Sequence, residues 1–343
     1  GSWLSIWLSR LGANVVGLSV DIPSNPSNFE ATCLDKIVDD RKIDIRDADK
    51  VKNIVAEVRP DFIFHLAAQS LVRRSYQNPM DTISTNVLGS ASILEAVRDY
   101  KKPVVVVMIT SDKAYDNVEW PWGYRETDRL GGKDPYSASK GMAEIAIRSY
   151  VESYFKDTKH NVRVGITRAG NVIGGGDWAH NRVVPDCIRS WSQNDPVEIR
   201  SPNSTRPWQH VLEPLSGYLT LGASLYENGD HHGEAYNFGP NMDQNYSVRE
   251  LIIEMSKYWE NVNWTDVSSK KDKLHEAGLL KLNCDKALCD LNWIPALGFS
   301  DTVRITASWY KTYYQDKKRK SMYEYAIRQI NEYIDLAKKK KID

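Results

Sequence analysis

Two side chains that could together remove a proton from an alcohol stand four residues apart. In the segment 136–140, Tyr-Ser-Ala-Ser-Lys, this spacing places Tyr136 and Lys140 on one face of a predicted helix. A free tyrosine has a pKa of about 10, so roughly 0.1% of it is ionised at neutral pH. A lysine cation one turn away favours the phenolate, which can take a proton while hydride leaves the same carbon. Because this spacing also arises by chance, the neighbouring residues must decide whether it is catalytic.

A second group of polar residues follows a predicted buried strand. The run 104–109 is rich in valine, and Ser111, Asp112 and Lys113 come soon after it. Doubly wound parallel sheets bind their ligands beyond the carboxyl ends of the strands. A serine there can hydrogen-bond a substrate hydroxyl, and an aspartate beside a lysine offers an acid and a base. Ser and Asp also cap turns at strand ends, but the Tyr136–Lys140 pair on the next helix favours the catalytic interpretation.

Short apolar runs alternate with helical segments in the first half of the chain. Because they are rich in β-branched residues, four runs are predicted as strands: 15–18, 62–66, 104–110 and 163–167. Strands that alternate with helices indicate βαβ units, so we predict an α/β fold with a doubly wound parallel Rossmann-type sheet. After about residue 168 the sequence becomes rich in Gly, Pro, Trp and Asn, which indicates a smaller mixed α/β C-terminal domain.

The charge balance and the cysteines argue against several classes of protein. The chain has 343 residues, in which 45 Lys and Arg balance 45 Asp and Glu. Without a basic excess, neither nucleic acid nor an anionic membrane is predicted as a partner, and no apolar run reaches the roughly 18–20 residues of a bilayer span. The 4 cysteines include no Cys-x-x-Cys pair, which indicates a reducing, cytoplasmic setting. The 7 histidines show no metal-ligand spacing, so no metal is predicted.

Several motifs resemble those of the extended short-chain dehydrogenase/reductase superfamily. Besides Ser111 and the Tyr-x-x-x-Lys pair, the chain has His-Leu-Ala-Ala-Gln at 65–69, Asp-Ile-Arg-Asp at 44–47 and Asn-Val-Leu-Gly at 86–89. The segments 168–178 and 206–219 are similar to those of nucleotide-sugar enzymes in that superfamily. Together with Thr-Ser-Asp-Lys at 110–113, they resemble the CDP-glucose 4,6-dehydratases, and the resemblance covers nearly the whole chain.

This resemblance implies a lyase that works with bound NAD. C4 of CDP-D-glucose would be oxidised, water would leave across C5 and C6, and hydride would return to C6, giving CDP-4-dehydro-6-deoxy-D-glucose for the 3,6-dideoxyhexoses of bacterial lipopolysaccharide. Carried over by position, Tyr136 is the base for the C4 hydroxyl, Lys140 holds the nicotinamide ribose, and Ser111 orders the C4 oxygen. Asp112 is the acid that protonates the departing C6 hydroxyl. Lys113 is either the base that removes the C5 proton or a cation that stabilises the developing enolate.

The resemblance also implies which residues hold the ligands. Gly1 stands in the place of the last glycine of a Gly-x-x-Gly-x-x-Gly loop, so we expect the first strand and two further glycines to precede it. NAD is the expected cofactor. In NAD-binding relatives an acidic residue accepts a hydrogen bond from the adenosine ribose, and because Ser19 stands in its place, NADP is left open. The predicted cofactor-binding residues are Gly1, Ser19, Asp44, Ile45, Leu66, Ala67, Ala68, Asn86, Tyr136 and Lys140. The predicted substrate-binding residues are Gln69, Asn171, Arg182, Arg206 and His210.

The same resemblance suggests how the chain is divided and how it assembles. Residues 1–168 are expected to form a dinucleotide-binding domain, and residues 169–343 a nucleotide-sugar-binding domain. Part of 205–228 is expected to pack back on the first domain. A homodimer or a dimer of dimers is expected, formed through helices near 79–100 and 135–155.

Two classes of alternative remain open. A 4-epimerase or another nucleotide-sugar 4,6-dehydratase would use the same scaffold, and an epimerase needs only Ser111, Tyr136 and Lys140. Asp112 and Lys113 therefore distinguish a dehydratase from an epimerase. The second class is a catalytically inactive member that binds a dinucleotide as a sensor, and the intact Ser111, Tyr136 and Lys140 argue against it.

Overall fold

Runs of buried β-branched residues form the main sheet of the protein. The computed structural model describes residues 1–157, 161–269, 279–315 and 321–342. The main strands are β3 Phe62–His65, β4 Val104–Ile109, β5 Val162–Ala169 and β10 Ala235–Phe238. They pair in parallel in the order β10-β5-β4-β3. Every residue of β4 from Val104 to Met108 is at most 2% exposed, as expected where helices cover both faces of a parallel sheet. The predicted parallel α/β fold is confirmed.

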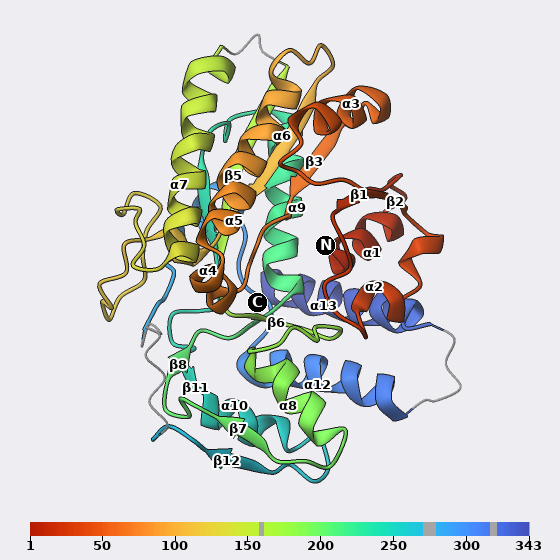
Figure 1. Ribbon diagram of the computed structural model, residues 1–343, viewed down its shortest axis with the longest axis vertical. Helices are drawn as coiled ribbons and strands as arrows, with labels where there is room; N and C mark the ends of the chain where they lie inside the picture. Colours follow the sequence, from red (N-terminus) through yellow and green to blue (C-terminus); the bar gives the residue numbers. More distant parts are fainter. Residues whose placement is uncertain (158–160, 270–278, 316–320, 343) are drawn as a thin grey trace.

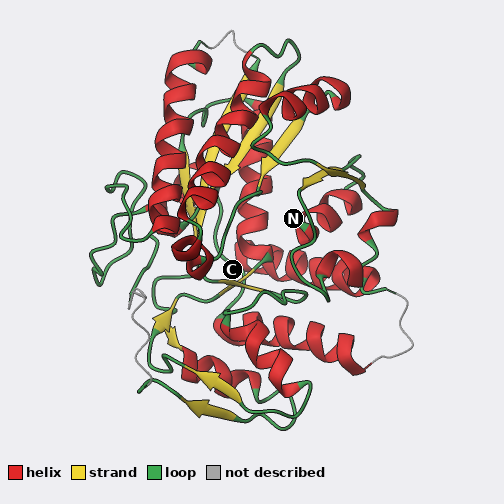
Figure 2. Ribbon diagram, in the orientation of Figure 1, coloured by secondary structure: helices red, strands yellow, loops and turns green. Residues whose placement is uncertain are grey.

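Alternate residues of β4 pack into two different cores, because successive side chains of a strand point to opposite faces. Val106 and Met108 belong to a core with three helices, which can be followed in Figures 1 and 2: α3 Ala48–Val58, α6 Gly89–Arg98 and α7 Pro135–Tyr150. Val107 belongs to the other core, with Leu221 of helix α9, Leu212–Glu227. The sheet is therefore enclosed on both sides, and its polar groups gather at the ends of its strands.

Strands β1 and β2 form a second, smaller parallel sheet. Within the described residues, β1 Val16–Ser19 pairs with β2 Asp39–Lys42 and with no strand of the main sheet. Helix α1, Ser2–Arg10, lies beside this sheet and packs on α13, Tyr323–Ile342 (Figure 1). The two terminal helices are joined by aromatic packing, since the rings of Trp7 and Tyr333 meet edge to face with centroids 5.7 Å apart.

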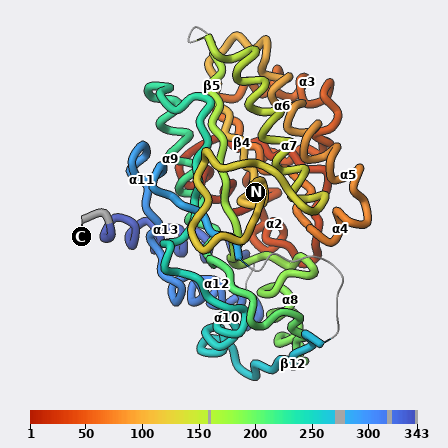
Figure 3. The backbone as a smooth tube through the Cα atoms, turned by 90° about the vertical axis from the view of Figure 1, so that its left-hand side faces the viewer, coloured from red at the N-terminus to blue at the C-terminus, as the bar shows by residue number. Residues whose placement is uncertain are grey.

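The second half of the chain adds elements beyond the carboxyl ends of β4 and β5. They are α8 Val183–Trp191, β7 Val197–Ile199, β8 Thr205–Arg206, β11 Tyr246–Ser247, α10 Val248–Met255, β12 Trp264–Asp266 and α12 Phe299–Gln315. Figure 3 shows α8, α10 and β12 together at one end of the molecule. The domain division at residue 168 stays a prediction. Two later segments lie on the main sheet, because α9 packs against β4 and β5 and β10 pairs with β5.

Shorter elements connect the larger ones. Early in the chain they are α2 Asn28–Ala31, η1 Leu34–Lys36, α4 Val72–Gln77, α5 Pro79–Ile83, the π-helix η2 Ser84–Leu88 and the 3-10 helix η3 Asp112–Ala114. Later they are the π-helix η4 Val151–Phe155, β6 Val172–Ile173, β9 Gln209–His210 and α11 Asp285–Leu291. The helix predicted near 79–100 is thus α5, η2 and α6 in succession.

Three features are absent from the part of the chain that the structure describes. No helix there combines the length and the apolar character needed to cross a bilayer. No disulfide joins the cysteines of the described segments. No three His, Cys, Asp or Glu side chains in these ranges come together as a metal site would require.

Helix α9 packs tightly against Phe238 of β10 at Gly217, which generates a testable prediction. A Cβ at this position would overlap the ring of Phe238, whereas a Cβ at Gly222 of the same helix would lie 3.4 Å from Phe64, an ordinary contact. We predict that Gly217→Ala lowers the free energy of unfolding by about 1–3 kcal/mol through overpacking. Gly222→Ala should leave it unchanged or raise it slightly, since alanine favours helix. Urea denaturation of both variants measures the difference, and equal stabilities would contradict the prediction.

Candidate active site

A cavity of about 1000 Å³ opens at the carboxyl ends of β4 and β5. Its walls come from the segment after β3, the start of α7, the segment after β5 and the start of α8. Most residues predicted for catalysis or substrate binding line it together: Ser111, Asp112, Lys113, Tyr136, Asn171, Arg182 and Arg206. Lys140, Gln69 and His210 are instead buried outside its lining. The structure therefore gathers residues from distant parts of the sequence into one site.

Ser111 begins a tight turn that orients Asp112. The Oγ of Ser111 accepts a hydrogen bond from the backbone N of Lys113 at 3.2 Å, which caps η3, and donates to Oδ1 of Asp112 at 2.9 Å. The other carboxylate oxygen lies against Gly170, where a Cβ would overlap it. Ser111 thus caps the turn as strand-end serines do, and in the same position it holds the side chain of Asp112 toward the cavity.

Burial raises the pKa of Asp112, because the charged carboxylate loses its hydration. The charge of Lys113, the hydrogen bond from Ser111 and the charge of Arg206 act in the opposite direction but do not outweigh burial. The residue is only 3% exposed. A carboxyl group that faces a cavity and keeps its proton at a higher pH than usual can act as a general acid.

Helix α7 begins at the cavity because Asp134 caps it. The Oδ1 of Asp134 accepts hydrogen bonds from the backbone N of Tyr136 and of Ser137, both at 3.0 Å. Pro135 occupies the first position of the helix, and both features are typical of helix starts. Tyr136 therefore lies in the first turn and Lys140 one turn later. Both side chains are buried, and of the two only Tyr136 lines the cavity.

Burial changes the pKa values of Tyr136 and Lys140 in opposite directions. It raises the pKa of Tyr136 to about 12, although a hydrogen bond with Ser111 and the charge of Arg182 act to lower it. It lowers the pKa of Lys140 to about 8, against the charge of Glu144. We expected the lysine, together with a positively charged nicotinamide ring, to bring the pKa of the phenol toward neutral pH. The protein's own residues do not do so, because loss of hydration of the buried phenolate is the larger effect.

His65, at the end of β3, is the second ionisable group that interacts with Lys140. Burial and the charge of Lys140 lower the pKa of His65 to about 3, so its imidazole is neutral. Its Nε2 lies 3.1 Å from Oγ of Ser90 on α6. Because the imidazole of His65 carries no positive charge, it does not repel the ammonium group of Lys140.

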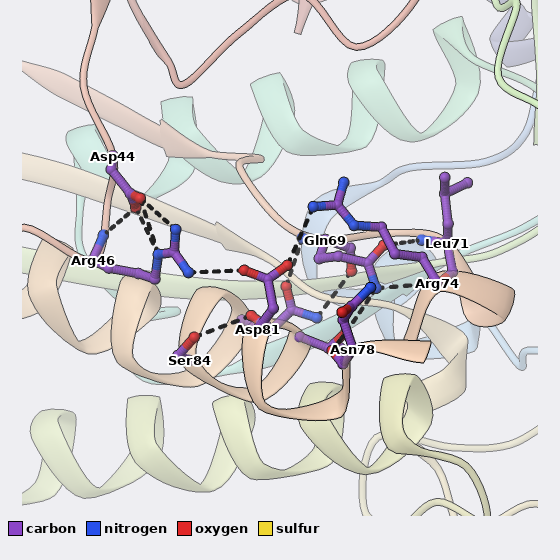
Figure 4. Close-up of polar contacts among 10 residues, drawn as sticks. Asp44, Arg46, Gln69, Leu71, Arg74, Asn78, Asp81 and Ser84 are labelled. Carbon is purple, nitrogen blue, oxygen red and sulfur yellow. Dashed lines mark hydrogen bonds and ion pairs between the residues drawn. The ribbon is translucent and has the colours of Figure 1, made fainter. Parts of the chain in front are cut away.

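The side-chain amides of Gln69 and Asn86 hold the segment after β3 in place. Gln69 Nε2 donates to Oγ1 of Thr82 at 2.9 Å, and its Oε1 accepts from the backbone N of Leu71 at 2.7 Å (Figure 4). Asn86 Nδ2 donates to the carbonyl oxygen of Gln69 at 3.0 Å and to Oγ of Ser139 on α7 at 2.8 Å. Both amides, which were predicted to bind ligands, thus make hydrogen bonds within the protein. Through these bonds they set the position of α7 relative to β3.

A row of alternating charges runs from the end of β2 to the cavity (Figure 4). Arg46 pairs with Asp44 at 2.6 Å and with Asp81 at 2.8 Å. Asp81 also pairs with Arg74, at 3.3 Å, and Arg74 lines the cavity. The hydrogen bond from Arg46 holds the pKa of Asp44 below its usual range. Asp44, which is predicted to bind the cofactor, is therefore ionised and fixed in orientation.

The other predicted cofactor-binding residues follow the ends of neighbouring strands. Ser19 ends β1 and accepts a hydrogen bond from Lys42 Nζ at 3.2 Å. Ile45 follows β2 and is buried against Gly89. The remaining residues follow β3 or precede α1: Leu66, Ala67, Ala68 and Gly1. Of these residues, Leu66, Ala67 and Ala68 follow the carboxyl end of β3, which pairs in parallel with β4, as a Rossmann-type cofactor site would require.

The predicted substrate-binding residues divide into two groups. Asn171, in a left-handed backbone conformation with φ 52°, lines the cavity together with Arg206. Arg182 also lines it and pairs with Asp177 at 3.0 Å. His210 is fully buried in β9 and lies outside the lining. Burial lowers the pKa of His210 to about 3, so this ring is neutral.

Two features of the site were missed in the sequence analysis. Tyr218 lines the cavity from α9, on the far side of the sheet, and no local spacing could have placed it there. Glu144 and Arg168 form a buried ion pair behind the site. Because Glu144 follows Lys140 by four residues, helical periodicity could have predicted that the two side chains lie on the same face of the helix.

Comparisons with known proteins show which family the chain belongs to. Residues 1–306 match the family described as GDP-mannose 4,6 dehydratase. The CDP-glucose 4,6-dehydratase of Salmonella typhimurium is 44% identical over 338 residues, which cover 97% of this chain and 93% of that protein.

Two solved structures share the fold. The UDP-glucose 4-epimerase of Thermotoga maritima with UDP-glucose has a TM-score of 0.74 and 21% identity, covering 91% of this chain and 95% of its own. The dTDP-glucose 4,6-dehydratase of Bacillus anthracis in complex with NAD has a TM-score of 0.72 and 19% identity, covering 91% and 93%. With most of its length matched, the chain belongs to the GDP-mannose 4,6-dehydratase family.

Proposed function

We propose that this protein is a hydro-lyase that converts CDP-D-glucose to CDP-4-dehydro-6-deoxy-D-glucose. The observation that carries the proposal is the single cavity that Ser111, Asp112 and Tyr136 line together. The 44% identity to the CDP-glucose 4,6-dehydratase of Salmonella typhimurium supports cytidine as the base. A buried acid that faces the cavity favours a dehydratase over an epimerase, because epimerisation eliminates no hydroxyl group and needs no acid to protonate one. The few cysteines of the sequence support a cytoplasmic setting.

Tyr136 takes the proton of the sugar C4 hydroxyl in this proposal. Ser111 interacts with the phenol and lowers its pKa, so one hydroxyl group can orient both the base and the C4 oxygen. Lys140, buried one turn further along α7, supplies the positive charge on that side of the site. These groups need no rearrangement to act together, because the start of α7 and the turn after β4 are both fixed by hydrogen bonds.

Asp112 gives its proton to the departing C6 hydroxyl. A ketone at C4 acidifies the C5 proton, so elimination across C5 and C6 needs one group that accepts that proton and one that protonates the leaving oxygen. Burial raises the pKa of Asp112, which favours the protonated form that the second task requires. Lys113, the next residue, is placed either to accept the C5 proton as a free amine or to stabilise the enolate as a cation.

Arginine side chains support a nucleotide diphosphate as the substrate. Arg182 and Arg206 line the same cavity as Tyr136. A guanidinium group binds phosphate oxygens through two parallel hydrogen bonds, which suits a diphosphate between sugar and base. Asn171, on the same wall, adds an amide that can donate to the same group.

The residues present fit a nicotinamide dinucleotide. Helix α1 begins at Gly1 without a side-chain cap, so the N–H groups of its first turn suit a diphosphate. Ala67 and Ala68 are small, and Lys140 can hold the nicotinamide ribose. A bound nicotinamide would supply the hydride acceptor for C4 and the hydride donor for C6. The NAD in the Bacillus anthracis dehydratase supports NAD here, and Ser19 leaves NADP open.

An exposed apolar face supports a homodimer, alone or as half of a dimer of dimers. Helices α6 and α7 pack side by side (Figure 1). On α7 and on its neighbours α5 and η2, several large apolar side chains are exposed: Met80, Leu88, Met142 and Ile145. Exposed apolar side chains on neighbouring elements are typical of interaction sites. The same helices of a second copy offer a matching apolar face, as a twofold interface requires.

A panel of nucleotide sugars tests the proposed reaction. With NAD and, separately, CDP-glucose, dTDP-glucose, UDP-glucose and GDP-mannose, the full-length protein should give the alkali-induced absorbance of a 4-keto-6-deoxy sugar with CDP-glucose alone. A C4 epimer without any keto sugar would identify an epimerase instead. Dinucleotide binding without turnover of any of the four would identify a sensor.

The close contact between Gly170 and Asp112 yields a second prediction. Gly170→Ala should displace the Asp112 carboxyl from Ser111 and lower kcat for dehydration about tenfold or more, with little change in KM. Gly298→Ala is the matched control, because no atom lies within 4 Å of a Cβ there. Steady-state kinetics with CDP-glucose measure both variants. A wild-type kcat in Gly170→Ala would show that the position of Asp112 does not matter.

The exposed face of α7 can be tested by charge. Ile145→Glu should weaken the dimer, because it would bury a carboxylate between two apolar faces. Ile253→Glu on α10 is the control, since its side chain is similarly exposed, at 55% against 60% for Ile145. Sedimentation equilibrium should show a lower association constant for the first variant only. Identical behaviour of the two variants would place the interface elsewhere.

A further inference from the structure

We propose that Glu144 is a positioning residue of the active site. Its buried ion pair with Arg168 holds α7, which carries Tyr136 and Lys140, against the end of β5, and its hydrogen bond from Thr110 connects it to the end of β4. Its negative charge balances the charge of Lys140. The proposal rests on the proposed function for the roles of Tyr136 and Lys140. Neither member of the ion pair lines the cavity, so both act through other groups of the site.

The ion pair is bidentate and fully enclosed. The side chains of Glu144 and Arg168 are both 0% exposed. Arg168 Nε donates to Oε1 of Glu144 at 2.7 Å, and Nη2 donates to Oε2. The same Oε1 accepts a hydrogen bond from Oγ1 of Thr110 at 2.7 Å. Thr110 directly precedes the turn that Ser111 begins after β4, which we call the catalytic turn. The Glu144 carboxylate therefore connects α7 to this turn.

Arg168 fixes the other side of the arrangement. Its Nη1 donates to Oη of Tyr115 at 2.6 Å and to the carbonyl oxygen of Glu126 at 3.3 Å. Its guanidinium also stacks over the ring of Tyr115, 4.6 Å from the centroid. The Oη of Tyr115 in turn donates to Oδ1 of Asn237 on β10 at 2.8 Å. One planar group therefore links the ends of β5 and β10 to the segment that follows the catalytic turn.

The charge of Glu144 acts on Lys140 across one turn of α7. The ionisable groups that interact with Lys140 are Glu144 and, from the end of β3, His65. Ser90 of α6, which contacts His65, carries no charge. Burial lowers the pKa of Lys140 to about 8, and Glu144 opposes this change. Without the charge of Glu144, Lys140 would lose its proton at a lower pH.

Stability alone does not account for an ion pair at this depth. Replacing a buried ion pair by apolar side chains of similar size is often neutral or stabilising. Here the pair joins the segments that carry Ser111, Tyr136 and Lys140, whose relative positions the reaction needs. A positioning role therefore predicts effects on catalysis that a loss of stability would not produce.

Three variants separate the charge of Glu144 from its geometry. Glu144→Gln keeps the size but removes the charge, so kcat for dehydration should fall about tenfold or more, and the alkaline limb of its pH profile should move down by about one pH unit. Glu144→Asp keeps the charge but shortens the side chain, so kcat should fall while the alkaline limb stays in place. Glu254→Gln is the control, because it breaks the 2.6 Å ion pair with Lys257 next to α10. The kcat and the pH profile of this control should match those of the wild type.

A binding measurement makes the test independent of turnover. Fluorescence titration with NAD across pH should show that Glu144→Gln loses affinity at a lower pH than the wild type. An unchanged pH dependence in Glu144→Gln, together with wild-type kcat in Glu144→Asp, would overturn the proposal even if both variants melt at lower temperature. If Glu144→Gln does not fold, kcat of Glu144→Asp decides alone. If the wild type binds NAD but leaves CDP-glucose unchanged, the proposed function fails, and the NAD titration still tests Glu144.

Discussion

The ion pair between Glu144 and Arg168 is the interaction on which the geometry of the site depends. It joins helix α7 to the end of β5, and through Thr110 it reaches the end of β4. The cavity opens where these three elements meet. Both charges are fully buried, so separating them carries a large energetic penalty, even though Arg148 also lies 4.0 Å from the Glu144 carboxylate. The spacing between the Tyr136 helix and the Ser111 turn is therefore rigid.

Burial is the common cause of the unusual acid–base properties around the cavity. It raises the pKa of Asp112 and of Tyr136 and lowers that of Lys140, because in each case the charged form loses its hydration. One physical effect thus prepares an acid that keeps its proton and an amine that can lose one. Neighbouring charges then adjust these pKa values, with Glu144 acting on the amine and Lys113 on the acid.

Strands β3, β4 and β5 of the main sheet were predictable because their signal is local, whereas β10 was not predicted. The runs 62–66, 104–110 and 163–167 became β3, β4 and β5, since continuous β-branched sequences suit a strand that is covered on both faces. The helix predicted near 79–100 contains the π-helix η2 at Ser84–Leu88, which apolar periodicity does not reveal. Asn86 lies in that π-helix and bonds to Gln69 and Ser139. Such long-range bonds leave no pattern along the chain.

The sequence by itself determined the fold class and singled out the candidate catalytic residues, because strand composition and the Tyr-x-x-x-Lys spacing depend on neighbours only a few residues away. Only the tertiary structure decided which polar residues face the cavity. Arg182 and Arg206 do so, whereas His210 and the amide of Gln69 lie outside the lining. It also decided the pKa values, since the hydration of a side chain depends on everything packed around it. Glu144 and Arg168 meet across the core for the same reason: contacts between distant segments are made only when the chain folds.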